Sequence, residues 1–159
     1  MADLKIDIVE KLVLNGVQQG GSHSSKFGGI NDVYRRIITV PATSSAVLAS
    51  FKSTVSTGSA AAMDVENIKY LRITNLNGTD NAAGAVNLGF LGETGNDDST
   101  ADFATTIKLR AQRSFLLGDT SASLNYSSSA NVNDTLYNIE SIIAKSSGSA
   151  KLEVFIAST

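Results

Sequence analysis

The strongest constraint on this sequence is a series of short segments in which apolar and polar residues alternate. Leu152, Val154 and Ile156, for example, alternate with Lys151 and Glu153. Because successive side chains of a β-strand point to opposite faces, such segments predict half-buried strands. No stripe with a 3.6-residue period continues beyond one or two turns, which argues against helices.

Turn signals such as Asn15-Gly16 and Asn77-Gly78 separate the alternating segments. We expect eight or nine strands, with residues 18–29, 52–63, 92–102 and 119–133 as loops and the last two strands paired as a hairpin through residues 145–149. This pattern predicts an all-β fold, an antiparallel β-sandwich or jelly roll of about eight strands. The expected strands lie at residues 3–15 (one long strand or two short ones), 32–40, 46–51, 68–73, 86–90, 107–110, 114–118, 136–144 and 151–159.

The length of 159 residues is about that of one domain, and no linker or repeat interrupts it. We therefore expect a single β-sandwich domain over residues 1–159. The sequence has no cysteine, which excludes disulfides, thiolate metal sites and cysteine nucleophiles. The formal net charge is −2, so we expect neither a nucleic-acid partner nor an anionic membrane partner.

The first residues carry charges at Asp3, Lys5 and Asp7 between apolar residues. This leaves no apolar core for a signal peptide, and no segment approaches the 18 apolar residues or so of a membrane span. We expect synthesis in a cytoplasm. Charged residues make up only 18% of the sequence, and small polar residues replace them, as in many β-proteins that contact other proteins.

His23 is the single histidine, with Ser22, Ser24 and Ser25 beside it. A catalytic triad needs a serine and a carboxylate arranged around the imidazole, and neighbouring side chains on a loop rarely meet that geometry. No G-x-S-x-G elbow is present. We predict a solvated loop histidine, no catalytic residues and no enzyme activity.

Residues 20–26, Gly-Gly-Ser-His-Ser-Ser-Lys, superficially resemble a phosphate-binding loop. Such a loop requires Ser or Thr after the lysine and the start of a helix, whereas Phe27, Gly28 and Gly29 follow Lys26. We therefore expect no nucleotide or other cofactor, and a loop that is either mobile or ordered by a partner.

Residues 93–102 contain four carboxylates, from Glu93, Asp97, Asp98 and Asp102. A loop of this kind can supply the several oxygens that Ca²⁺ requires, but the spacing is not that of an EF-hand. A solvated acidic loop is the preferred interpretation and a structural cation the alternative, so no residue is assigned to a metal.

Aromatic residues are few, 6% of the sequence, and tryptophan is absent. A sugar-binding surface usually depends on exposed aromatic rings. A carbohydrate-binding module is therefore an alternative function, and it would have to use the tyrosines. Paired carboxylates of a glycosidase cannot be located by spacing. The candidate tyrosines are Tyr34, Tyr70, Tyr126 and Tyr137.

Arginines occur in two groups, Arg35-Arg36 and Arg110 with Arg113. In a chain of negative net charge, we expect them in ion pairs on strand faces or as anchors in protein interfaces. Residues 151–159 predict a strand that is either paired and tied down or exposed as an edge, and an exposed edge would be a natural subunit contact.

Three phrases resemble small β-sandwich virion structural proteins of tailed bacteriophages. They are Tyr-Leu-Arg-Ile-Thr-Asn-Leu at residues 70–76, Val-Asn-Leu-Gly-Phe at 86–90 and Ser-Phe-Leu-Leu-Gly at 114–118, followed by the expected closing hairpin at 136–158. The resemblance covers about residues 68–159. It implies a protein that decorates a capsid or builds tail and neck parts, and it carries no catalytic residue over to this chain.

The resulting expectation is a bacteriophage capsid decoration (cement) protein, made in the host cytoplasm and located in the virion. It would stabilise the shell by contacts with the major capsid protein or other virion proteins and with identical subunits, a homotrimer being favoured. A neck, tail or fibre component is the first alternative, and a carbohydrate-binding module or a β-sandwich hydrolase are further ones.

Overall fold

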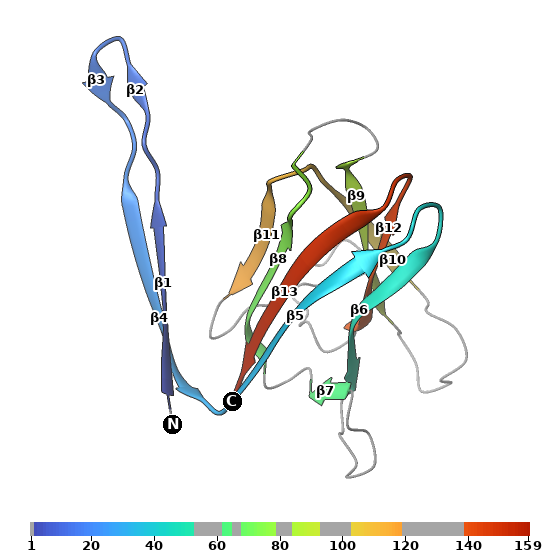
Figure 1. Ribbon diagram of the computed structural model, residues 1–159. Coiled ribbons are helices and arrows are strands. Elements are labelled where there is room, and N and C mark those ends of the chain that lie inside the picture. The colour runs from blue at the N-terminus through green and yellow to red at the C-terminus, as the bar shows by residue number, and fades with distance from the viewer. Residues whose placement is uncertain (1, 53–61, 65–67, 79–83, 93–102, 119–138) are drawn as a thin grey trace.

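The computed structural model describes residues 2–52, 62–64, 68–78, 84–92, 103–118 and 139–159. Within these residues the chain is almost entirely β-strand and contains no α-helix. Two sheets pack face to face with the core between them, so the predicted all-β sandwich is confirmed (Figure 1).

The larger sheet has five strands in the order β10-β9-β12-β6-β7. All neighbours are antiparallel except the short parallel pair β6 and β7. Four of these strands match expected segments, whereas β7 begins inside a segment expected to be a loop. The strands are β6 (Ser45–Lys52), β7 (Ala62–Asp64), β9 (Val86–Gly92), β10 (Phe103–Leu109) and β12 (Ile139–Ser146).

The smaller sheet has four antiparallel strands in the order β11-β8-β13-β5. All four were expected: β8 and β13 from alternation, β5 from its β-branched and aromatic residues, and β11 as a short apolar segment that ends at a glycine. The strands are β5 (Asp32–Val40), β8 (Ile68–Asn75), β11 (Ser114–Gly118) and β13 (Ala150–Ser158).

The core lies between the two sheets and consists mainly of aliphatic side chains. Phe90 of the larger sheet contacts Phe115 of the smaller one, with ring centroids 5.3 Å apart. The buried amide of Asn75 donates hydrogen bonds to the carbonyl oxygens of Gly84 and Leu109, which ties the end of β8 to neighbouring turns. The largest fully buried aliphatic side chains are Leu48, Ile73, Leu88, Ile142, Leu152 and Ile156.

Residues 2–30 form a long β-hairpin outside both sheets, here called the arm (Figure 1). β1 (Ala2–Val9) pairs with β4 (Ser22–Ile30), and the ribbon continues into β2 (Val13–Leu14) and β3 (Val17–Gln18). Two backbone hydrogen bonds, from Glu10 to Gly21 and from Gln19 to Leu12, link the two parts. Residues 3–15 were expected to form one long strand or two short ones, and the structure has two strands there, the longer β1 and the two-residue β2.

The prediction of a loop at residues 18–29 is wrong, because Ser22–Ile30 is a strand. Its glycines and serines cannot fill a core, but the backbone hydrogen bonds to β1 hold the strand without one. The Asn15-Gly16 turn is confirmed as the hairpin tip: both residues have positive φ, 51° and 78°, as a two-residue type I′ turn requires.

Two further expectations are corrected. About eight strands is too low, since the two sandwich sheets hold five and four strands and the arm adds four more strand segments. β12 and β13 are not a hairpin, because they belong to opposite sheets and the turn at Ser147-Gly148 carries the chain from one sheet to the other. Both strands bury apolar side chains in the core between the two sheets.

Candidate interaction surface

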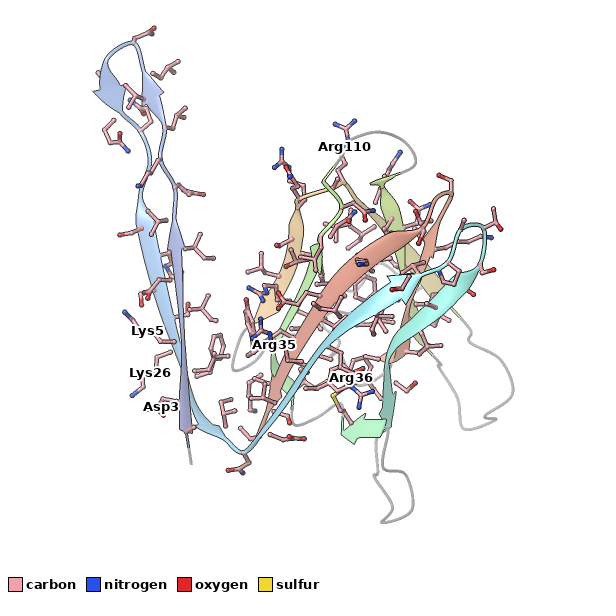
Figure 2. All side chains as sticks on the ribbon, in the orientation of Figure 1. Asp3, Lys5, Lys26, Arg35, Arg36 and Arg110 are labelled. Carbon is pink, nitrogen blue, oxygen red and sulfur yellow. The ribbon has the colours of Figure 1, made fainter. Side chains whose placement is uncertain are left out.

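The two faces of the arm differ in chemistry. The register of β1 and β4 places Leu4, Ile6 and Ile8 on one face, whereas the intervening residues Lys5 and Asp7 lie on the other. On the charged face, Lys5 pairs with Asp7 at 3.1 Å and Lys26 with Asp3 at 2.7 Å. Figure 2 shows Lys5 and Lys26 pointing away from the sandwich, so the apolar face is turned toward it.

Within the described residues, the arm contacts the sandwich near its base, which we call the root. Phe27 and Ile30 of the arm are buried against Tyr70 and Ala157 of the smaller sheet. The rings of Phe27 and Tyr70 lie 6.0 Å apart, and the Asn31 amide donates a hydrogen bond to the Ser158 carbonyl at 3.0 Å. Burial raises the pKa of the Tyr70 hydroxyl, as expected for a phenol held in an apolar contact.

Gly118 of β11 leaves room for this root contact. A Cβ at residue 118 would lie 2.7 Å from Tyr70 and 3.2 Å from Phe27, closer than side chains normally approach. The smaller sheet is therefore shaped for the arm at this position. Leu4, Ile6 and Phe155 pack around the same cluster with part of their surface exposed.

Beyond the root, the arm carries apolar side chains that nothing in the described part of the chain covers. Five of them, here called the arm tip, are more than half exposed. Neighbouring tip residues point to opposite faces of the ribbon, so the tip is apolar on both sides. The arm tip consists of Val9 (61% exposed), Leu12 (54%), Val13 (66%), Leu14 (57%) and Val17 (56%).

A second exposed apolar surface lies on the smaller sheet, on the face turned away from the core. We call it the outer face, and its strands supply Val33, Ile37 and Leu116, which are 49%, 64% and 43% exposed. Leu116 pairs with Arg72, and Arg72 with Phe155, in one row across the sheet. The outer face thus continues the apolar surface on which the root of the arm already packs.

A charged trio lies among these apolar side chains. The Arg35 guanidinium donates two hydrogen bonds to one Glu153 carboxylate oxygen at 2.8 and 2.7 Å, and Arg72 donates to the other at 2.7 Å. The Nε atom of Arg72 is buried without a hydrogen-bond partner. Two guanidinium groups and one carboxylate give the trio a net charge of +1, with a donor still unsatisfied.

The arginine prediction is confirmed for Arg35, which forms an ion pair on a strand face. Its neighbour Arg36 lies over the Tyr34 ring, 5.2 Å from the centroid, in a cation–π contact. Arg110 and Arg113 flank the turn between β10 and β11. Figure 2 shows Arg110 well away from Arg35 and Arg36. The structure therefore does not bring the two arginine groups together.

His23 lies on β4 of the arm and is exposed. Its Nε2 atom is 3.0 Å from the Ser25 hydroxyl, two residues along the same strand face. This contact provides neither a buried imidazole nor an orienting carboxylate, both of which a triad needs. The glycine-rich segment at 20–26 runs along the same ribbon, and no helix follows it within the described residues.

The acidic loop at residues 93–102 lies outside the described residues, and its cation alternative stays a prediction. Among the residues that the structure does describe, no group of three or more His, Asp or Glu side chains could hold a metal ion. An open hollow of about 500 Å³ is lined by Thr43, Asn87, Lys108 and Lys145, together with smaller residues. Its lysines are exposed on the surface.

The tyrosines do not form an exposed platform where they are described. Tyr34 is partly buried and donates a hydrogen bond to the Leu48 carbonyl at 3.3 Å, while Tyr70 lies under the arm root. Tyr126 and Tyr137 lie outside the described residues. A sugar-binding surface would therefore have to use other side chains.

The carboxyl-terminal strand is paired and tied down, the first of the two expected states. β13 lies between β5 and β8 and is hydrogen bonded to both. The alternative, an exposed edge for a subunit contact at residues 151–159, is therefore wrong.

The sequence did not predict the arm, the candidate interaction surface. The available signal was the Asn15-Gly16 turn, which lies almost midway between two segments of similar length and so marks a hairpin. Alternation alone cannot distinguish an apolar strand face that lies in a core from one that stays exposed.

Comparison with known proteins gives no relative for this surface. No protein-family model, curated protein or solved structure matches the chain. In the described portion, no helix is long and apolar enough to cross a membrane.

Proposed function

We propose that this chain is a structural protein that assembles with other protein subunits through its arm and its outer face. The observation that carries the proposal is the arm tip, a ribbon end with five apolar side chains exposed on both of its faces. Exposed apolar patches of this kind mark protein interaction sites, because leaving them in water opposes solubility.

The energetics support a contact of useful strength. Complete burial of a Val or Leu side chain contributes about 1.5–3 kcal/mol. Since each arm-tip residue is more than half exposed, covering all five contributes on the order of 5 kcal/mol before the cost of association. Contacts made by the outer face add to this, so a single arm can contribute a substantial part of a stable interface.

The specific setting that we propose is a bacteriophage virion, with the chain acting as a capsid decoration protein. Support comes from the phrases at residues 70–76, 86–90 and 114–118, which resemble those of small virion proteins and lie in β8, β9 and β11. A projecting arm on a small sandwich suits a protein that bridges neighbouring subunits of a shell. A cyclic homotrimer remains the favoured assembly.

A neck, tail or fibre component is the alternative within the same setting, since an arm that binds neighbours suits any of these parts. The carbohydrate-binding alternative has weaker support, because Tyr34 and Tyr70 are engaged within the fold. The same arm would also serve a non-viral assembly, and the presence or absence of the chain in virus particles distinguishes the two settings.

Two measurements test this proposal. The purified chain, at micromolar concentration, should sediment together with purified capsids when the two are mixed. The same chain centrifuged alone is the reference. Mass spectrometry of particles should then give a copy number close to that of the shell protein for decoration, and a far smaller one for a neck or tail part. Absence of the chain from particles would contradict the virion setting.

A further inference from the structure

We infer that the arm tip of one copy docks on the outer face of a second copy, so that each chain gives an arm to one neighbour and accepts an arm from another. This inference rests on the proposed function and names the partner of the arm. The occupant of the outer face is a second copy of this same chain, rather than a protein of different sequence.

The first argument is continuity with a contact that already exists. At the root, Phe27 and Ile30 of the arm pack on Tyr70 and Ala157 of the smaller sheet. Beyond the root, the arm continues with the exposed tip, and the sheet continues with Ile37 and Leu116. The arm and the smaller sheet therefore contact each other at the root, and both have exposed apolar residues beyond it. The arm of a neighbouring copy can repeat the root contact on this exposed part of the sheet.

The second argument is size. Residues 8–14 of the arm span about 20 Å at roughly 3.3 Å per residue, and the nine residues of β13 span about 30 Å. A ribbon two strands wide fits on a sheet four strands wide, since neighbouring strands lie about 4.8 Å apart. One arm tip therefore fits on one outer face.

The third argument is charge. The trio of Arg35, Glu153 and Arg72 gives the outer face a net positive charge, and the Arg35 side chain, 68% exposed, is the accessible guanidinium. Glu10, exposed on the arm beside the tip residues Val9 and Leu12, supplies a carboxylate. A docked arm can place this carboxylate near the guanidinium groups. This attraction favours docking of the arm on the outer face over docking on an uncharged apolar patch.

The fourth argument is reciprocity. Each chain carries one exposed arm tip and one exposed outer face, so identical copies can cover both surfaces at once. Such contacts are heterologous and close into a ring when the rotation between copies allows it. The favoured trimer is one such ring.

The test uses the full chain with single substitutions at exposed positions, which keep the core intact. Leu14→Asp should disable the arm tip and Ile37→Asp the outer face. Each variant alone should lose self-association, with at least a tenfold increase in the dissociation constant by sedimentation equilibrium. Val47→Asp is the matched control, because Val47 is 59% exposed on the other sheet and its variant should assemble like the unmodified chain.

Mixing the two variants gives the decisive result. The Ile37→Asp chain retains an intact arm and the Leu14→Asp chain an intact outer face, so the mixture should form a one-to-one complex and no larger ring. Because the chain lacks cysteine, Leu14→Cys mixed with Ile37→Cys should also form an intermolecular disulfide, whereas Leu14→Cys mixed with Val47→Cys should not.

Opposite outcomes separate this inference from the proposed function. A chain that stays monomeric yet sediments with capsids would overturn arm exchange between copies and leave the structural role intact. Oligomers that survive both Asp substitutions would also overturn it. Self-association through the arm, combined with absence from particles, would retain the inference and remove the virion setting.

Discussion

The arm and the sandwich are built from the same kind of strand, but they use their apolar residues in opposite ways. In the sandwich, side chains such as Leu152 and Ile73 are fully buried between two sheets. In the arm, residues of the same type, such as Leu14, remain more than half exposed. An isolated two-stranded ribbon is marginally stable in water, so the arm depends on the contacts at its root.

This contrast indicates that the two regions of the chain have different roles. The sandwich provides stability through its core, whereas the arm leaves apolar surface exposed, which we propose is used for contacts with other subunits. The following predictions test whether the two regions respond independently, and they are ordered from the largest expected effect to the smallest.

The largest effect is expected in the sandwich. Leu152→Ala should lower the free energy of unfolding by about 2–5 kcal/mol, because it removes a fully buried side chain from the central strand of the smaller sheet. Chemical denaturation followed by circular dichroism measures the change. Leu116→Ala, an exposed position of the same sheet, should cost no more than about 0.5 kcal/mol.

A smaller, regional effect is expected at the root. Phe27→Ala should release the arm while the sandwich stays folded, because Phe27 supplies the main aromatic contact between them. Amide hydrogen exchange should accelerate throughout residues 2–30 and change little in β13. The free energy of opening of the arm should fall by up to roughly 3 kcal/mol, the cost of deleting such a side chain. Ile8→Ala, on the same face but 44% exposed, should leave exchange almost unchanged. Uniform acceleration in both regions would show that they unfold as one unit.

A still smaller effect is expected at the hairpin turn. Gly16→Val should destabilise the tip by about 1 kcal/mol or more, because a β-branched residue is strained at a φ of 78°. Nuclear magnetic resonance should show chemical-shift changes confined to residues near the turn. Gly21→Val offers a control in open space at a glycine without positive φ.

The smallest effect is an acid dependence confined to the arm. A hydrogen bond from Ser24 and the nearby Lys5 lower the pKa of Asp7 below its ordinary value of about 4. The charged carboxylate therefore stabilises the ribbon above pH 4 or so, and this contribution is lost as the pH falls through the lowered pKa. Protection factors of arm amides, which are exchange rates corrected for the intrinsic effect of pH, should fall slightly below about pH 4, and Asp7→Asn should abolish that fall. A similar fall in the variant would assign it to another group.

The sequence predicted most of the sandwich, because a strand with one buried face must alternate. Residues 68–73 and 151–159 alternate and correspond to β8 and β13, whereas residues 32–40, which form β5, are marked by β-branched and aromatic residues instead. The pairing of these strands was less accessible. The turn at Ser147-Gly148 has the composition of a hairpin turn, yet it joins two sheets, because its composition does not specify whether the flanking strands share hydrogen bonds.

The arm and the candidate surface were harder to predict. Ser22–Ile30 contains few strongly strand-forming residues and is held by pairing with β1, a contact that only the folded chain shows. The charged trio joins residues 35, 72 and 153, which are distant in sequence and become neighbours only through strand order. The alternation of β1 was visible, but nothing in it indicated which apolar residues would remain uncovered.

The position of β13 has a consequence for how the protein reaches its native state. This strand lies between β5 and β8, and its first residue, Ala150, pairs with Val40. β5 and β8 are synthesised early, but they enter one sheet only when the much later β13 is inserted between them. Pairing between segments so distant in sequence slows folding. Until that segment arrives, both strands have open edges, and the nascent chain is most exposed to pairing with the wrong neighbour during this interval.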